Sequence, residues 1–128
     1  MSHRMKSAIL LIIASLFCFP ALAKDVVALT YEQALVAWED TKSNPGWLDY
    51  LNLAVEFNNE HRIDERGGCY KKGTLPVKLV TTTNSEGVIT SVVANVSNPK
   101  SECFKKVLLG VKFPKPPYAP FYDHWEMR

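Results

Sequence analysis

The sequence has few of the side chains that build catalytic or metal centres. Histidine occurs only three times in 128 residues. Beyond residue 23 the histidines are His61 and His124, and the cysteines are Cys69 and Cys103. Two histidines and one cysteine pair do not match the ligand spacing of a zinc site. A glycine-rich phosphate loop and a serine nucleophile elbow are also missing. We therefore expect no catalytic residues, no cofactor and no metal, and we do not predict an enzyme.

The chain also has no apolar run of the length that a bilayer requires. The uncharged run Ala8–Phe19 follows two basic residues and ends at Pro20. From residue 8 to Ala23 there are sixteen positions, whereas a spanning helix needs about 20 apolar residues. The small residues Ala21 and Ala23 suit a signal peptidase. We predict that residues 1–23 are a cleavable secretory signal of a bacterial chain that works in the periplasm or is secreted. A retained anchor is the alternative; after cleavage no stable membrane anchor is expected.

Removing this signal leaves only Cys69 and Cys103 as cysteines. An even pair in a small exported chain favours a disulfide bond, with two free thiols as the alternative. Closing a loop of this length is expected to stabilise the fold by about 4 kcal/mol through loop-closure entropy.

Charge is balanced over the predicted mature chain but divided along it. Residues 25–65 carry nine acidic and two basic side chains, and residues 66–128 carry ten basic and four acidic ones. Two oppositely charged halves can attract each other within one fold. No aromatic residues interleave with the basic ones as in nucleic-acid sites, so a nucleic-acid partner is not expected.

Two helices are predicted in the acidic half. Thr30 and Gln33 have the spacing of a capping box, and apolar residues recur at helical intervals to about Lys42. After the turn at 43–46, a second helix is predicted from Trp47 to Ile63. It is apolar on more than one side, so we expect it to be covered from more than one direction. Together these helices are expected to form a helical hairpin in segment 24–66.

The second half changes to the two-residue period of strands. Strands are predicted at 75–83 and 88–97, joined by a hairpin turn in which Gly87 is available for a positive φ. In the second strand Ile89 and Val92 are expected on opposite faces. Asn98 and Pro99 then have the residue types of a helix start, and a last strand is predicted at 121–127. The predicted fold is α+β, in the order α-α-β-β-α-β, with a three-stranded antiparallel sheet and one disulfide, and with segments 24–66 and 67–128 packed as a single domain.

Segment 68–117 resembles the C-terminal domain of TonB-type energy transducers, a periplasmic β-β-α-β module. The resemblance consists of residues in a common order: Cys69-Tyr70, then Asn84-Ser85-Glu86-Gly87-Val88-Ile89, Asn98-Pro99, Cys103 and Val111-Lys112-Phe113-Pro114. Energy transducers keep an uncleaved anchor and a long spacer, which a helical hairpin replaces here. The resemblance therefore implies a fold, a compartment and a mode of binding rather than force transduction.

In that family the last strand lies at the sheet edge and can accept an extended segment of a partner. The matching residues here are the predicted partner-binding site: Phe121, Tyr122, Asp123, His124, Trp125, Glu126 and Met127. An unidentified periplasmic or envelope protein is the expected partner. The alternatives are that the strand is covered by the helical hairpin, or by a second copy in a homodimer through the edge strand.

Two functional classes follow from these observations. The first is an exported adaptor that engages a protein through its sheet edge. The second is a periplasmic inhibitor or immunity protein that blocks a toxin or an envelope enzyme, with an acidic surface made by Glu32, Glu39, Asp40 and Asp49.

Overall fold

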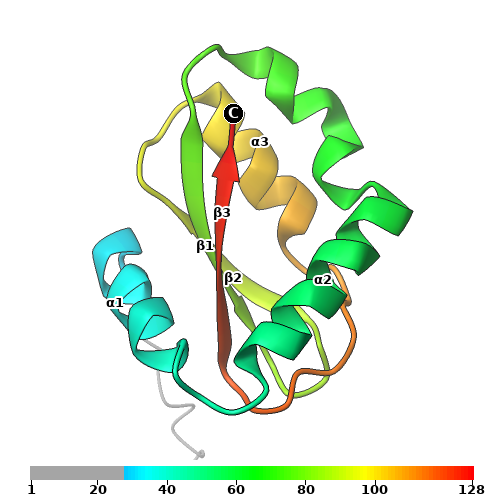
Figure 1. Ribbon diagram of the computed structural model, residues 1–128. Helices are drawn as coiled ribbons and strands as arrows, with labels where there is room; N and C mark the ends of the chain where they lie inside the picture. The colour runs from blue at the N-terminus through cyan, green and yellow to red at the C-terminus, as the bar shows by residue number, and fades with distance from the viewer. Residues whose placement is uncertain (1–27) are drawn as a thin grey trace, which may run out of the picture.

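The structure of the protein is a computed structural model that describes residues 28–128 (Figure 1). The predicted signal, residues 1–23, and its cleavage site lie outside the described residues. The described elements are, in order, α1 (Tyr31–Thr41), α2 (Trp47–His61), η1 (Ile63–Lys72), β1 (Val77–Thr83), β2 (Ile89–Ala94), α3 (Pro99–Leu108) and β3 (Phe121–Met127). The predicted α+β class and its order of helices and strands are confirmed. The 3₁₀ segment η1, which follows α2 directly, was not predicted.

The three strands form one antiparallel sheet in the order β2-β1-β3. The central strand β1 pairs with β3 over its whole length, from Val77 opposite Met127 to Thr83 opposite Phe121. The last strand of the chain therefore lies at an edge of the sheet.

The expected alternation in β2 is wrong at its start. Between Thr82 and Thr83 the register of the β1–β2 pair shifts, so that Thr83 pairs with Ile89 and Thr90 is skipped. One extra residue reverses the side on which the following side chains lie. As a result Ile89 and Val92 lie on the same face and both belong to the hydrophobic core.

Helices cover both faces of the sheet (Figure 1). On one face α2, η1 and α3 enclose the main core, in which Leu79, Phe104 and Leu108 are fully buried. On the other face α1 packs across the strands with Ala34 only 1% exposed. The central strand is thus buried on both sides, since Val80, the neighbour of Leu79, is also fully buried.

The two N-terminal helices do not pack against each other as the predicted hairpin. They lie on opposite faces, and the connection between them passes the end of the sheet where β3 begins (Figure 1). The hydroxyl of Tyr118 donates a hydrogen bond to the carbonyl oxygen of Thr41 at 3.3 Å, and Gly46 lies against Pro117. The physical reason is that β1 has a fully buried apolar side chain on each face, Leu79 on one and Val80 on the other, so each face needs a helix to cover it.

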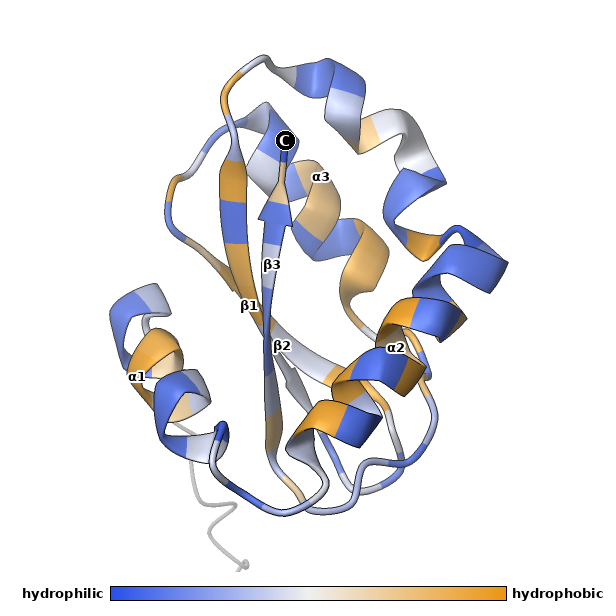
Figure 2. Ribbon diagram, in the orientation of Figure 1, coloured by the Kyte–Doolittle hydropathy of each residue, from blue (hydrophilic) through white to orange (hydrophobic). Residues whose placement is uncertain are grey.

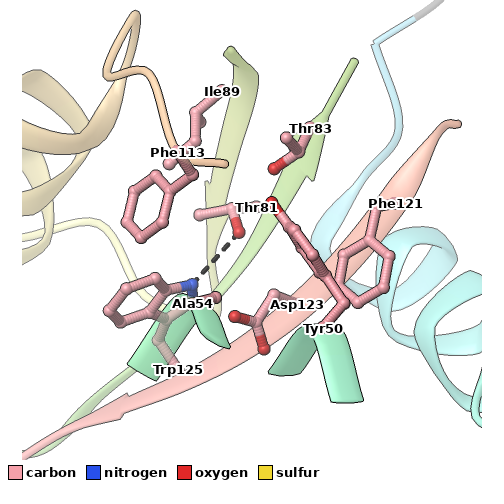
Figure 3. A pocket seen from close by; sticks show the side chains of 9 residues that line it. All are labelled: Tyr50, Ala54, Thr81, Thr83, Ile89, Phe113, Phe121, Asp123 and Trp125. Carbon is pink, nitrogen blue, oxygen red and sulfur yellow. Dashed lines mark hydrogen bonds between the residues drawn. The ribbon is translucent and has the colours of Figure 1, made fainter. Parts of the chain in front are cut away.

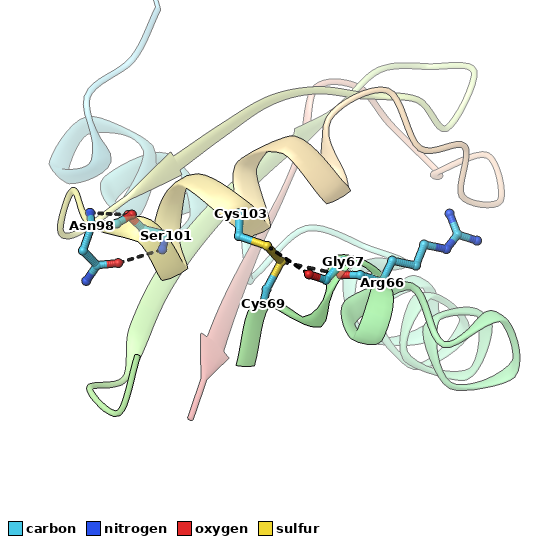
Figure 4. Close-up of a disulfide and its surroundings, with 6 residues drawn as sticks. All are labelled: Arg66, Gly67, Cys69, Asn98, Ser101 and Cys103. Carbon is cyan, nitrogen blue, oxygen red and sulfur yellow. Dashed lines mark hydrogen bonds between the residues drawn. A yellow bond between two sulfur atoms is a disulfide. The ribbon is translucent and has the colours of Figure 1, made fainter. Parts of the chain in front are cut away.

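The predicted disulfide is confirmed. It joins Cys69 in η1 to Cys103 in α3, with 5.4 Å between the two Cα atoms (Figure 4). The start of α3 also follows the prediction. The side chain of Asn98 accepts a hydrogen bond from the N–H of Ser101 at 2.8 Å, and the Ser101 hydroxyl accepts one from the N–H of Asn98 at 2.9 Å. Across residues 28–128, none of the helices has the length and apolar character needed to cross a membrane.

Candidate partner-binding site at the sheet edge

The direction of the main-chain groups in β1 can be assigned from its contacts with the chain beyond β2. The N–H of Asn95 donates to the carbonyl oxygen of Lys78 at 3.0 Å, and the N–H of Lys78 donates to the Asn95 side chain at 3.0 Å. Both groups of Lys78 therefore point away from β3. Because this direction alternates along a strand, the main-chain groups of Leu79 and Thr81 point toward β3.

The same alternation defines the free edge of β3. Trp125 and Asp123 are the register partners of Leu79 and Thr81, so their N–H and C=O groups face β1. The N–H and C=O groups of Tyr122, His124 and Glu126 consequently point away from the sheet. Outward-pointing groups of this kind can pair with an added strand.

A groove runs along this edge, between β3 and α2. It has a volume of about 360 Å³. Its lining takes in five consecutive residues of β3 together with residues of α2 and η1: Leu51, Ala54, Val55, Asn58, Asp64, Tyr70, Asp123, His124, Trp125, Glu126 and Met127. Five strand residues span roughly 13 Å, which is enough for a short extended segment.

The wall formed by α2 is unusually apolar for a surface. Leu51 and Val55 both line the groove, and Val55 is 51% exposed. Leu48 and Leu53, which lie outside the groove lining, are also exposed on this helix, at 59% and 44%. Figure 2 shows hydrophobic bands along the whole of α2. The expectation that this helix is covered from more than one direction is wrong for the described part of the chain, which leaves these side chains open.

A hydrogen-bond network closes the end of the groove at η1. The Asp64 carboxylate accepts hydrogen bonds from the side-chain amide of Asn58 at 3.1 Å and from the hydroxyl of Tyr70 at 2.7 Å. The same hydroxyl lies 3.4 Å from the sulfur of Met127. Burial, the hydrogen bond to Asp64 and the nearby negative charges raise the pKa of Tyr70 well above its usual value. Asp64 thus connects Asn58 on α2 to Tyr70 on η1 and holds this end of the groove in place.

Asp123 occupies a different environment. Its side chain lies between the rings of Trp125 and Tyr50, on the side of the sheet that faces α2 (Figure 3). Burial raises the pKa of Asp123 to about 7, and the main-chain N–H of His124 partly opposes this by donating a hydrogen bond to the carboxylate. The ion pairs found among residues 28–128 do not include Asp123. Its carboxylate is a negative group with no cationic partner.

The cavity next to Asp123 is too small for a substrate. It measures about 10 Å³, which is close to the smallest space that can hold one water molecule. Trp125 points its indole N–H across this space to the hydroxyl of Thr81, at 3.1 Å (Figure 3). The hydrogen bond between Trp125 and Thr81 therefore belongs to the packed interior. The groove along the sheet edge is the larger of the two spaces.

His124 points to the opposite face of the sheet. Its ring lies 4.8 Å from the ring of Trp38, and its Nε2 is 3.3 Å from the hydroxyl of Tyr31. Burial lowers the pKa of His124, and the positive charge of Lys78 lowers it further. The histidine therefore anchors α1 to β3, and its side chain is not free to contact a partner in the groove.

The seven residues predicted as the partner-binding site thus divide into different roles. Phe121 and Met127 are 1% and 3% exposed, so their side chains belong to the core. Tyr122 lines a separate hollow beside β2, and Glu126 forms a surface ion pair with Arg128 at 3.2 Å. The side chains of Asp123 and Trp125 and the outward main-chain groups are what the strand offers to the groove.

The residues of α2 and η1 that complete the groove were not predicted as part of a site. Leu51, Val55 and Asp64 come from segments that the sequence assigned to a helix or its end, and Tyr70 was named only as part of the family resemblance. The signal in the sequence that could have indicated the groove is the number of apolar residues on α2, which is larger than one buried face requires.

Comparisons with protein families, curated proteins and solved structures give no match for this chain. Within residues 28–128 no group of histidine, cysteine, aspartate and glutamate side chains is arranged to hold a metal ion.

Proposed function

We propose that this protein is an exported adaptor with a TonB C-terminal-like fold, and that it binds a protein partner by adding an extended segment to β3. The observation that carries the proposal is the groove of about 360 Å³ in which Asp123–Met127 form one wall and the apolar side of α2 forms the other. Main-chain hydrogen bonds to His124 and Glu126 would supply affinity, and the side chains of α2 would supply specificity.

The apolar side chains of Leu51 and Val55 on α2 support the same proposal. Apolar side chains that are open on a helix beside a free strand edge gain stability when a partner covers them, at about 25 cal/mol per Å² of apolar surface. A partner strand would occupy the edge and bring side chains against Leu51 and Val55. The confirmed disulfide is compatible with an oxidising compartment such as the periplasm.

The alternative of an inhibitor with one acidic surface has less support. Glu32, Glu39 and Asp40 are exposed on α1, whereas Asp49 is exposed on α2, and the two helices lie on opposite faces of the sheet (Figure 1). These carboxylates do not gather on one face in the way that mimicry of an acidic ligand would require.

The proposal is tested by removing one outward-pointing N–H without touching the ladder to β1. Glu126→Pro does this, because proline is tolerated on an edge strand where its nitrogen faces outward. Glu126→Ala removes the same side chain but keeps the N–H and is the matched control. We expect wild type and Glu126→Ala to recover the same partner from a periplasmic extract, and Glu126→Pro to lose it while melting as a folded protein. Equal recovery by all three proteins would contradict binding at the edge.

A photo-crosslinking residue provides a second measurement. Placed at Val55 in the groove, it should crosslink the recovered partner. Placed at Leu75, which is 71% exposed and absent from the groove lining, it should not.

A further inference from the structure

The groove has a marked imbalance of charge. Its lining contains three carboxylates, those of Asp64, Asp123 and Glu126, and no lysine or arginine. Two of these carboxylates already have partners, because Asp64 accepts hydrogen bonds from Asn58 and Tyr70, and Glu126 pairs with Arg128. Asp123 is the only one of the three carboxylates that, within residues 28–128, neither pairs with a cation nor accepts a hydrogen bond from another side chain.

Asp123 also lies where the side chain of an added strand would reach it. On β3 the side chains of Asp123 and Trp125 point to the α2 side of the sheet. A neighbouring strand places its residues directly beside them, with Cβ atoms about 5 Å apart, and every second residue of that strand points to the same side. The residue beside Asp123 would meet its carboxylate, and the residue two positions away would meet Trp125 and the apolar wall of α2.

We infer that the segment bound by this groove carries a lysine or arginine beside Asp123 and an apolar residue two positions away, packed against Leu51 and Val55. This inference rests on the proposed function and names the chemistry of its partner. A second copy of the chain fits less well, because its own edge strand would bring Asp123 and Glu126 toward the same carboxylates. A partner with a basic-x-apolar strand offsets the charge and covers Leu51 and Val55 on α2.

Binding of such a segment is coupled to a proton. The pKa of Asp123 is raised to about 7 by burial, so below that pH the carboxyl must release a proton before it can pair with a cation. Affinity should therefore fall as the pH drops below about 7, by up to tenfold for each pH unit. The titratable groups that surround Asp123 are Tyr50 on α2, Asp64 and Tyr70 on η1, and His124 and Glu126 on β3. A lysine in the segment keeps its charge throughout this range.

The experiment uses defined capped peptides of about six strand-forming residues, the usual length of a strand. One peptide has lysine followed two positions later by valine, and its matched controls have glutamate or norleucine in place of the lysine. Dissociation constants are measured at pH 8 and pH 6 by following the amide resonances of His124 and Glu126. We expect the lysine peptide to bind at least about tenfold more tightly than the glutamate peptide at pH 8, and to weaken at pH 6.

Asp123→Asn is the decisive variant, since it keeps the shape and removes the charge. It should lose both the preference for lysine over norleucine and most of the pH dependence. A preference that survives in Asp123→Asn would overturn the inference. Binding of all peptides with equal affinity, with shifts at the edge amides, would overturn the inference and leave the adaptor function standing.

The remaining outcomes are also decisive. Failure of every peptide to bind would overturn the assigned chemistry, and the Glu126→Pro and Glu126→Ala pair would then decide separately whether the edge is used at all. Edge amides that broaden with protein concentration, together with a dimer in light scattering, would assign the groove to a second copy and contradict a basic partner.

Discussion

The main-chain N–H of Phe113 donates a hydrogen bond to the carbonyl oxygen of Gly87 at 2.8 Å. This contact fastens the segment after α3 to the turn between β1 and β2. The segment approaches so closely that a Cβ atom on Gly87 would collide with the carbonyl oxygen of Phe113, and the φ angle of Gly87 is +89°. A glycine is required here for two independent reasons, the sign of φ and the lack of space.

We therefore expect Gly87→Ala to lower the free energy of unfolding by at least about 3 kcal/mol, combining the left-handed backbone with a main-chain clash. Gly110→Ala is the matched control, because Gly110 has a φ of +82° and nothing within 4 Å of its Cβ position. Gly110→Ala should lower the free energy of unfolding by only about 1 kcal/mol, the cost of placing alanine in the left-handed backbone region. Chemical denaturation of both variants makes the comparison, and equal losses would show that the approach of Phe113 is not limiting.

The disulfide should contribute strongly to stability, because Cys69 and Cys103 are 34 residues apart in sequence. Loop-closure entropy for this separation predicts that replacing both cysteines with serine lowers the free energy of unfolding by about 4 kcal/mol. Denaturation of the oxidised protein and the double variant measures the difference. Adding a reductant should destabilise the wild type to a similar extent and leave the double variant unchanged, whereas no response of either protein would contradict a closed loop.

Helix α3 should depend on its first residue. Asn98 caps the helix by accepting the N–H of Ser101, so Asn98→Ala is expected to cost about 1 kcal/mol. Asn98→Asp keeps the acceptor and should retain nearly all of the stability. A denaturation series on the three proteins tests this, and equal losses in both variants would mean that some property other than the cap is responsible.

The fold was predictable wherever local chemistry and tertiary packing agree. Thr30 and Asn98 cap their helices as the sequence indicates, because capping involves only atoms three residues apart. The strand 121–127 was also predicted with its correct bounds. These are local signals, and they need no knowledge of what lies across the sheet.

Other features depend on contacts that no local pattern encodes. The bulge at Thr90 arises from the pairing of two strands, and its effect on Ile89 is visible only once the register is known. The placement of α1 and α2 on opposite faces depends on Val80 being apolar on the second side of β1. The groove was missed because its walls come from α2, η1 and β3, so its lining residues are far apart in sequence.

Two neighbours on β3 should make the stability of the protein depend on pH in opposite directions. The pKa of Asp123 is raised from 3.8 to about 7 by burial, so between these values the folded state holds a proton that the unfolded state has released. The free energy of unfolding should therefore fall as the pH rises from about 4 to 7, by up to about 1.4 kcal/mol per pH unit. Asp123→Asn removes this contribution, and its stability relative to the wild type should be greater at pH 8 than at pH 5.

The opposite sign is expected for His124, whose pKa is lowered by burial and by the charge of Lys78. Below a pH of about 6.5, the ordinary value for histidine, the unfolded state binds the proton more readily than the folded state does. The contribution of His124 to stability should thus be present at neutral pH and be lost as the pH falls, together with its contact with Trp38. His124→Gln should therefore be destabilised relative to the wild type by less at pH 5 than at pH 7. Thermal unfolding of Asp123→Asn, His124→Gln and the wild type between pH 5 and pH 8 tests both predictions. If the stability differences of the two variants from the wild type changed with pH in the same direction, the opposite effects of the two side chains would be contradicted.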